Sequence, residues 1–120
     1  MDRSNEIGKE ETTTMQRITD EDGSIVGRFD ETKAESFEEG TYFNGSNHIS
    51  LATGSQWDHN TLYHTAGDKW ILHYWSQWQG SKYGYMEIKG KEACEWFIKN
   101  EHDDLAEEFF PDISEKMTIR

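Results

Sequence analysis

Three histidines and two aspartates in the centre of the chain could bind a metal ion or transfer protons. Asp58 adjoins His59, His64 follows five residues later, and Asp68 lies between His64 and His73. Imidazole nitrogens bind zinc, and a carboxylate beside an imidazole helps it to act as a general base. No His-x-His, His-x-Glu or His-Glu-x-x-His spacing is present. A metal-dependent hydrolase with its site at His59, His64 and His73 is therefore an alternative that depends on the fold.

Hydroxyl and thiol groups that could act as nucleophiles are also present. Ser50, Ser55 and Ser76 lie outside any G-x-S-x-G elbow of the kind that activates a serine. Cys94 stands on a predicted helix beside Trp96, and we expect it to be a small buried apolar residue. We therefore lean against an enzyme, assign no catalytic residue and expect no cofactor.

A short internal repeat points to a binding surface. Ser55-Gln56-Trp57 recurs as Ser76-Gln77-Trp78, and each copy follows a predicted strand. Two such corners at neighbouring strand ends would place Trp57 and Trp78 side by side. The pair could then stack on a sugar, a base or a partner side chain. The alternative is that the two tryptophans only plug the edge of the sheet.

Charged and aromatic residues divide the chain in opposite ways. The 24 acidic and 12 basic residues give a net charge of −12. Residues 41–90 hold three of each sign, whereas residues 15–40 and 91–120 each carry a net charge of −5. The neutral centre contains all five tyrosines and four of the five tryptophans, side chains that favour strands. The acidic excess disfavours direct binding to nucleic acid or to an anionic membrane, both of which need a basic surface.

The excess acids fall in three clusters, at residues 20–22, 35–39 and 101–108. Like charges at this spacing repel one another, and a basic partner would relieve that cost. We hypothesise a non-enzymatic protein-binding module that docks on a basic protein. It would occupy a site meant for phosphates and so inhibit a nucleic-acid-processing enzyme or a toxin, as a nucleic-acid mimic or antitoxin does. The predicted binding residues are Asp103, Asp104, Glu107, Glu108, Trp57, Trp75 and Trp78.

Local patterns in the first half of the chain predict a hairpin, a helix and a strand. Apolar runs flank the polar loop at residues 20–23, which ends in a glycine, as in an antiparallel hairpin. Asp30 is placed to cap a short helix over residues 30–39. Residues 48–53 alternate in polarity as a strand does.

The central hairpin decides where the histidines lie. We predict strands on both sides of residues 66–69, with Thr65 opposite Trp70. In that register, His64 and His73 share one face of the sheet. Both faces would carry large apolar side chains, which makes a homodimer possible.

The second half of the chain places helices after strands. A turn at residues 79–81 leads to a strand over residues 83–88, and residues 91–100 predict a helix with an apolar stripe. Asp103 could cap a second helix that Pro111 ends. Because the helices follow the strands and do not alternate with them, we predict an α+β fold. It would be an antiparallel meander of three to five strands with the C-terminal helices packed on one face.

The length of 120 residues allows one domain. We expect a disordered acidic and polar tail at residues 1–14, one domain over residues 15–111 and a short C-terminal tail at residues 112–120. A single cysteine excludes an internal disulfide, and no apolar run approaches the roughly 18 residues of a membrane span. The polar N-terminus shows no signal peptide. These features predict a cytoplasmic protein that does not bind membranes.

Two stretches are distinctive as sequence. They are NGSNHISLATGSQW at residues 44–57 and WSQWQGS at residues 75–81. Together they resemble a group of small uncharacterised prokaryotic proteins, over roughly residues 29–100. The resemblance implies that the central block is one intact domain. It implies no activity, ligand or site residue.

Overall fold

The computed structural model describes residues 15–78 and 83–120. These residues form strands followed by helices, which confirms the predicted α+β class. The tail predicted at residues 1–14 and the turn predicted at residues 79–81 lie outside the described residues. The strands are β1 (Met15–Thr19), β2 (Ile25–Asp30), β3 (Glu35–Glu38), β4 (Thr41–Phe43), β5 (His48–Ser50), β6 (Asp58–His64), β7 (Trp70–Ser76) and β8 (Gly84–Ile88). The helices are η1 (Glu31–Lys33), α2 (Gly90–Lys99), α3 (Asp103–Phe109) and α4 (Pro111–Met117).

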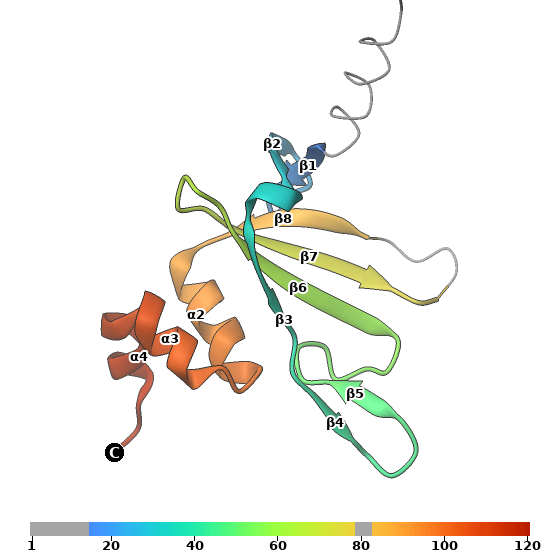
Figure 1. Ribbon diagram of the computed structural model, residues 1–120, viewed down its shortest axis with the longest axis vertical. Coiled ribbons are helices and arrows are strands. Elements are labelled where there is room, and N and C mark those ends of the chain that lie inside the picture. Colours follow the sequence, from blue (N-terminus) through green and yellow to red (C-terminus); the bar gives the residue numbers. More distant parts are fainter. Residues whose placement is uncertain (1–14, 79–82) are drawn as a thin grey trace, which may run out of the picture.

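Six strands form one sheet in the order β2-β1-β8-β7-β6-β3 (Figure 1). Strands β6, β7 and β8 are the antiparallel meander that the sequence predicts. The predicted β1–β2 hairpin is also confirmed, but it joins the meander through β1, which runs parallel to β8. The sheet is therefore mixed, and it has more strands than the three to five expected. Strands β4 and β5 form a separate two-stranded sheet.

The helix predicted over residues 30–39 is wrong beyond its first turn. Asp30 does cap a helix, since its Oδ1 accepts a hydrogen bond from the Thr32 amide at 3.0 Å, but this helix is the single 3-10 turn η1. Strand β3 follows and pairs with β6, which places Phe37 opposite Leu62 in the core. Burying Phe37 against the sheet outweighs the weak helix preference of a short polar segment.

The register of the central hairpin differs by one residue from the predicted one. His64, and not Thr65, lies opposite Trp70. Beyond that pair, the Thr65 amide donates to the Lys69 carbonyl, which encloses a loop of three residues instead of two or four. The last loop residue, Asp68, takes up a left-handed conformation with φ 65°. A shift of one residue moves every side chain of a strand to the other face. His64 and His73 therefore lie on opposite faces of the sheet.

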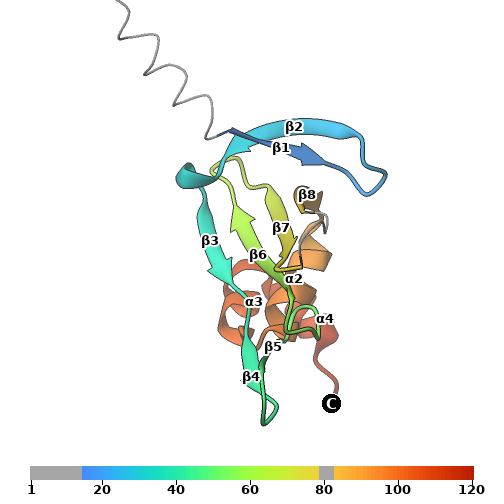
Figure 2. The ribbon, with the colours of Figure 1, turned by 90° about the vertical axis from the view of Figure 1, so that its right-hand side faces the viewer.

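The C-terminal helices cover one face of the sheet, as predicted (Figures 1 and 2). From α2, Trp96 and Phe97 pack against the sheet residues Leu62, Trp70 and Ile88. This cluster is the larger of the two cores. Its apolar side chains come from β3, β6, β7 and β8 on the sheet side, so the helical layer fastens those four strands together.

The helical layer is longer than the sequence suggested. Pro111 ends α3, as expected, but it also occupies the first turn of α4, where a tail was expected at residues 112–120. Proline suits the first turn of a helix because it has no amide hydrogen to leave unpaired. Ile113 packs against the core. None of the described helices is long and apolar enough to cross a membrane.

The opposite face of the sheet carries a second, smaller core. The β1–β2 hairpin curves across one end of this face and packs Ile18 and Phe29 against Ile71 and Tyr85 (Figure 2). Farther along the same face, His73 is only half-buried. Polar and aromatic side chains at the start of β6 and the paired end of β7 therefore lie outside both cores.

Candidate functional site

The three histidines predicted to form a site are separated in the structure. His64 lies on the helix-covered face, stacked on Trp70 with ring centroids 4.1 Å apart, and its Nε2 is 2.8 Å from Asp68 Oδ1. His73 and His59 lie on the other face. Within the part of the chain that the structure describes, no group of three His, Cys, Asp or Glu side chains comes together to hold a metal ion. The predicted metal cluster is therefore not assembled.

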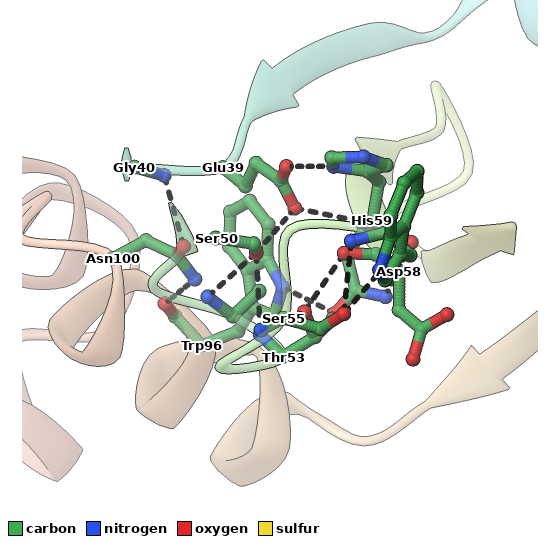
Figure 3. Close-up of polar contacts among 12 residues, drawn as sticks. Glu39, Gly40, Ser50, Thr53, Ser55, Asp58, His59, Trp96 and Asn100 are labelled. Atoms are coloured by element: carbon green, nitrogen blue, oxygen red, sulfur yellow. Dashed lines mark hydrogen bonds and ion pairs between the residues drawn. The ribbon is translucent and has the colours of Figure 1, made fainter. Parts of the chain in front are cut away.

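His59 pairs with Glu39, the residue that follows β3 (Figure 3). The distance from His59 Nδ1 to Glu39 Oε2 is 2.6 Å. Glu39 Oε1 accepts hydrogen bonds from the Ser50 hydroxyl at 2.7 Å and from the backbone amide of Asn60 at 2.8 Å. The Glu39 side chain is only 10% exposed, so these partners take the place of water around its charge. His59 Nε2 is buried and has no hydrogen-bond partner among the described residues.

The serines considered as nucleophiles have structural hydrogen bonds. Besides its bond to Glu39, the Ser50 Oγ accepts bonds from two backbone amides of the following turn, at 3.1 and 3.2 Å. The strand predicted over residues 48–53 therefore ends at Ser50. In the described residues, none of the three serines is hydrogen-bonded to a histidine. Cys94 is fully buried on α2, and burial, with a smaller effect of Glu95, raises the pKa of its thiol.

A second carboxylate, that of Glu31 in η1, binds aromatic side chains of β6 and β8. Glu31 Oε2 accepts hydrogen bonds from the Tyr63 hydroxyl at 2.9 Å and the Tyr85 hydroxyl at 3.2 Å. Burial and the Glu31 charge raise the pKa of both phenols, that of Tyr85 to about 12. His73 stacks flat on Tyr85, with centroids 4.1 Å apart, and Trp75 is 4.9 Å from His73. This group anchors η1 to the sheet, and it places Trp75 on the half-buried face.

The predicted pairing of Trp57 with Trp78 is confirmed as a structural feature. In each Ser-Gln-Trp repeat, the serine Oγ accepts a hydrogen bond from the tryptophan amide, at 2.9 Å for Ser55 and 3.1 Å for Ser76. The backbone amide of Gln77 donates to the backbone carbonyl of Trp57 at 2.9 Å and so joins the two repeats. The indole centroids are 4.9 Å apart, with the rings tilted by 48°. Trp57 is 38% exposed and Trp78 is 58% exposed.

The acidic residues predicted to bind a partner are exposed on α3. These residues are Asp103, Asp104, Glu107 and Glu108. In the described part of the chain, their side chains take part in no ion pair and no hydrogen bond. The cluster at residues 35–39 is divided, because Glu35 and Glu38 are exposed on β3 whereas Glu39 turns inward to His59.

The acids of the β1–β2 loop help to line an open groove of about 580 Å³, which we call the acidic groove. Its other walls are the β6–β7 loop, the end of β8 and the start of α2. Lys69 and Glu87 form an exposed ion pair there, at 3.7 Å. Val26, half of whose surface is exposed, provides an apolar edge. The six carboxylates, which face only two lysines, belong to Asp20, Glu21, Asp22, Asp68, Glu87 and Glu92.

The acids of α3 and the tryptophans do not form one surface. Helix α3 lies on one side of the molecule and the C-terminal end of β7 on the other (Figure 1). The Ser-Gln-Trp repeat was the signal that located the tryptophan corner. Reasoning from the sequence missed Glu39 as the partner of His59, because it placed Glu39 on a helix. Phe37 is the only buried residue among the four of β3, so the sequence carries no alternating pattern that could have indicated a strand there.

No protein-family model, curated protein or solved structure matches this chain. The resemblance drawn from residues 44–57 and 75–81 therefore stays a prediction.

Proposed function

We propose that the protein is a non-enzymatic module that docks on a basic protein partner and blocks a surface that otherwise holds phosphates. The observation that carries this proposal is the acidic groove, where six carboxylates from four separate segments face two lysines. Folding has gathered these charges from across the sequence. Because like charges held close together destabilise a fold, a cationic partner would relieve part of that cost.

The groove suits a protruding cationic segment. It is open and has the exposed Val26 at its edge, so a lysine or arginine stem could lie on the apolar edge while its charge meets the carboxylates. Carboxylates accept paired hydrogen bonds from arginine in the way that phosphate oxygens do. This shared chemistry supports a nucleic-acid mimic as the more specific form of the proposal, with a nucleic-acid-processing enzyme or a toxin as the partner.

The exposed acids of α3 would extend the same negative field. Complementary charge chiefly raises association rates and rejects wrong partners, so a second acidic surface need not touch the partner closely to contribute. We therefore expect the groove to supply the contact and α3 to accelerate the encounter.

The experiment uses a fluorescein-labelled arginine-rich peptide and stopped-flow anisotropy. Glu21 and Asp22 line the groove, and their side chains hold no hydrogen bond in the described structure, so Glu21→Lys/Asp22→Lys should fold normally. This double reversal should slow association about tenfold at low salt. The wild-type rate should also fall steeply as ionic strength rises from about 20 to about 150 mM.

Glu35→Lys/Glu38→Lys is the matched control, because it makes the same change in net charge on exposed residues of β3, at the opposite edge of the sheet. Glu107→Lys/Glu108→Lys makes that change on α3 and should reduce the association rate less than the groove reversal does. If all three double reversals slow association equally, only net charge matters and the groove is not a docking site. With a basic host protein captured at low salt, duplex DNA should compete for the same surface.

A further inference from the structure

The tryptophan corner lies beside a hollow that the proposed docking function does not use. The hollow measures about 300 Å³ and opens next to the exposed Trp57. The ring centroid of Trp78 is 4.9 Å from that of Trp57, so Trp78 packs beside the indole that lines the hollow without lining it itself. The lining residues are Asn47, His48, Gln56, Trp57, His59 and Gln77.

The lining has an unusual composition for so acidic a chain. Three of its side chains are carboxamides, each with two donors and one acceptor oxygen, and two are imidazoles. None of the described residues that line it is Asp, Glu, Lys or Arg. A site with paired donors and acceptors, an aromatic wall and no carboxylate, lysine or arginine in its described lining suits a neutral ligand that carries hydroxyl groups.

His59 supplies an independent sign of a missing partner. Its Nδ1 is engaged by Glu39, which itself holds two further hydrogen bonds and so fixes the imidazole in place (Figure 3). Its Nε2 is buried without a partner among the described residues. Buried polar atoms nearly always have a hydrogen-bond partner, so the unpaired nitrogen of this lining residue indicates a partner that reaches it after a small movement of the side chains that cover it.

We propose that this hollow, with Trp57 in its lining and Trp78 packed beside Trp57, binds a neutral saccharide. A pyranose ring would lie against the face of Trp57, and its hydroxyls would meet the carboxamides of Gln56, Gln77 and Asn47. An oligonucleotide fits less well, because no cation of the described lining could neutralise its phosphates and the whole chain carries a net charge of −12.

The test starts from an array of neutral oligosaccharides, namely glucans, galactans, mannans and chitin fragments, with titration calorimetry of any saccharide that binds. A mixed-sequence single-stranded oligonucleotide is included as a competing ligand class. The variants are Trp78→Ala, Trp57→Ala/Trp78→Ala and Gln56→Ala/Gln77→Ala. The control is Tyr42→Ala, which removes from β4 an aromatic side chain whose exposure lies between those of Trp57 and Trp78 and which does not line the hollow. Circular dichroism and melting curves establish that each variant folds.

We expect saturable binding of at least one saccharide. Trp78→Ala should weaken it about tenfold, which corresponds to the loss of one well-packed contact. The double tryptophan variant should abolish binding, and Tyr42→Ala should leave it unchanged. His59→Gln, which keeps an amide donor for Glu39, should also weaken binding. Three results would overturn the proposal: no saccharide bound at millimolar concentration, affinity unchanged in the folded double tryptophan variant, or binding of the oligonucleotide alone.

The saccharide site and the docking function can fail separately. Glu21→Lys/Asp22→Lys changes only the acidic groove and should leave saccharide affinity unchanged. The tryptophan variants should leave the association rate of the arginine-rich peptide unchanged.

Discussion

Asn100, the residue that follows α2, is hydrogen-bonded to Gly40, the residue that leads into β4 (Figure 3). The Gly40 amide donates to Asn100 Oδ1 at 2.9 Å, and Asn100 Nδ2 donates to the Trp96 carbonyl at 2.8 Å. Asn100 is only 2% exposed. This single side chain therefore connects the C-terminal end of α2 to the segment that carries Glu39 and leads to the two-stranded sheet.

Breaking this tie should destabilise the whole domain. Asn100→Ala leaves the Gly40 amide without its partner, whereas the Trp96 carbonyl still accepts from the backbone amide of residue 100, and we expect a loss of about 1–3 kcal/mol in the free energy of unfolding. Urea denaturation followed by tryptophan fluorescence measures the change in the free energy of unfolding. A change of less than about 0.5 kcal/mol would show that the contact is not maintained in solution.

Gly40 itself should not tolerate a side chain. A Cβ atom there would stand 2.7 Å from the Asn100 carbonyl oxygen and 2.8 Å from Leu51 Cδ1. Because the first of these is backbone, Gly40→Ala must displace the end of α2, and we expect a loss of about 1–3 kcal/mol in the free energy of unfolding. Gly27→Ala is the matched control, since a Cβ there meets nothing within 4 Å. Equal melting temperatures for the two variants would contradict the close approach.

Glu39 should matter far more to stability than its neighbour Glu38. Glu39→Gln replaces one acceptor oxygen by a donor group, while the Ser50 hydroxyl, the Asn60 amide and His59 Nδ1 all approach that carboxylate. The amide keeps the two Oε1 contacts only if its NH2 group faces His59 Nδ1, which must then accept, and the charge of the buried acceptor is lost in either orientation; we expect a loss of about 1–3 kcal/mol. Glu38→Gln, on an exposed side chain, should change the free energy of unfolding by less than about 0.5 kcal/mol. Urea denaturation of the two variants decides the matter, and similar values would refute the role given to Glu39.

Local signals were sufficient for the elements whose partners lie close in sequence. The β1–β2 hairpin follows from a polar loop that ends in Gly23, which adopts φ 86°. Helix α2 follows from its apolar stripe, and Trp96 and Phe97 are buried as that stripe requires. The Ser-Gln-Trp repeat predicted the contact of Trp57 with Trp78 because each copy makes the same local serine turn.

The misses have non-local or conformational causes. Strand β3 exists because Phe37 finds Leu62, a partner 25 residues away, and no local pattern carries that information. The register of the central hairpin depends on Asp68, and not the adjacent Gly67, taking up the left-handed conformation. His64 supports that choice by bonding to the Asp68 carboxylate. The register that this loop sets places His64 and His73 on opposite faces of the sheet, so the predicted metal cluster does not form.

His73 should make the domain less stable at mildly acidic pH. Burial lowers the pKa of its imidazole below the ordinary value of 6.5, and the Glu31 carboxylate opposes this only in part. Tyr85 and Trp75, which pack against the ring, hold no charge at this pH. Between the lowered pKa and 6.5, the unfolded chain binds more protons than the folded one, so stability is lost as the pH falls through that window.

Melting temperatures measured between about pH 7 and pH 5 test this effect of His73. His73→Phe, which keeps the stack on Tyr85 without a titrating group, should flatten the decline of the melting temperature with falling pH. His48→Gln changes an exposed histidine and should leave the decline as it is in the wild type. If His73→Phe and the wild type decline in parallel, then His73 is not a source of the pH dependence.

Cys94 should react with thiol reagents only when the domain unfolds. It is fully buried on the inner side of α2, and burial raises the pKa of its thiol, with Glu95 adding to the effect. The thiolate is the reactive form, so both the lack of access and the raised pKa suppress reaction with a disulfide reagent such as dithiobis(nitrobenzoate). Because Cys94 is the only cysteine, the absorbance change reports on it alone.

We expect one equivalent of the reagent to react at once in urea. In native buffer, the reaction should be slower by a factor of about the equilibrium constant of unfolding. The positive control is Ser46→Cys in a Cys94→Ala background, which places the thiol on an exposed turn and should react at once without urea. Asn100→Ala should raise the native rate for Cys94 in proportion to its loss of stability. Rapid labelling of the native wild type at an unchanged melting temperature would mean that α2 opens locally, against the packing seen for Phe97.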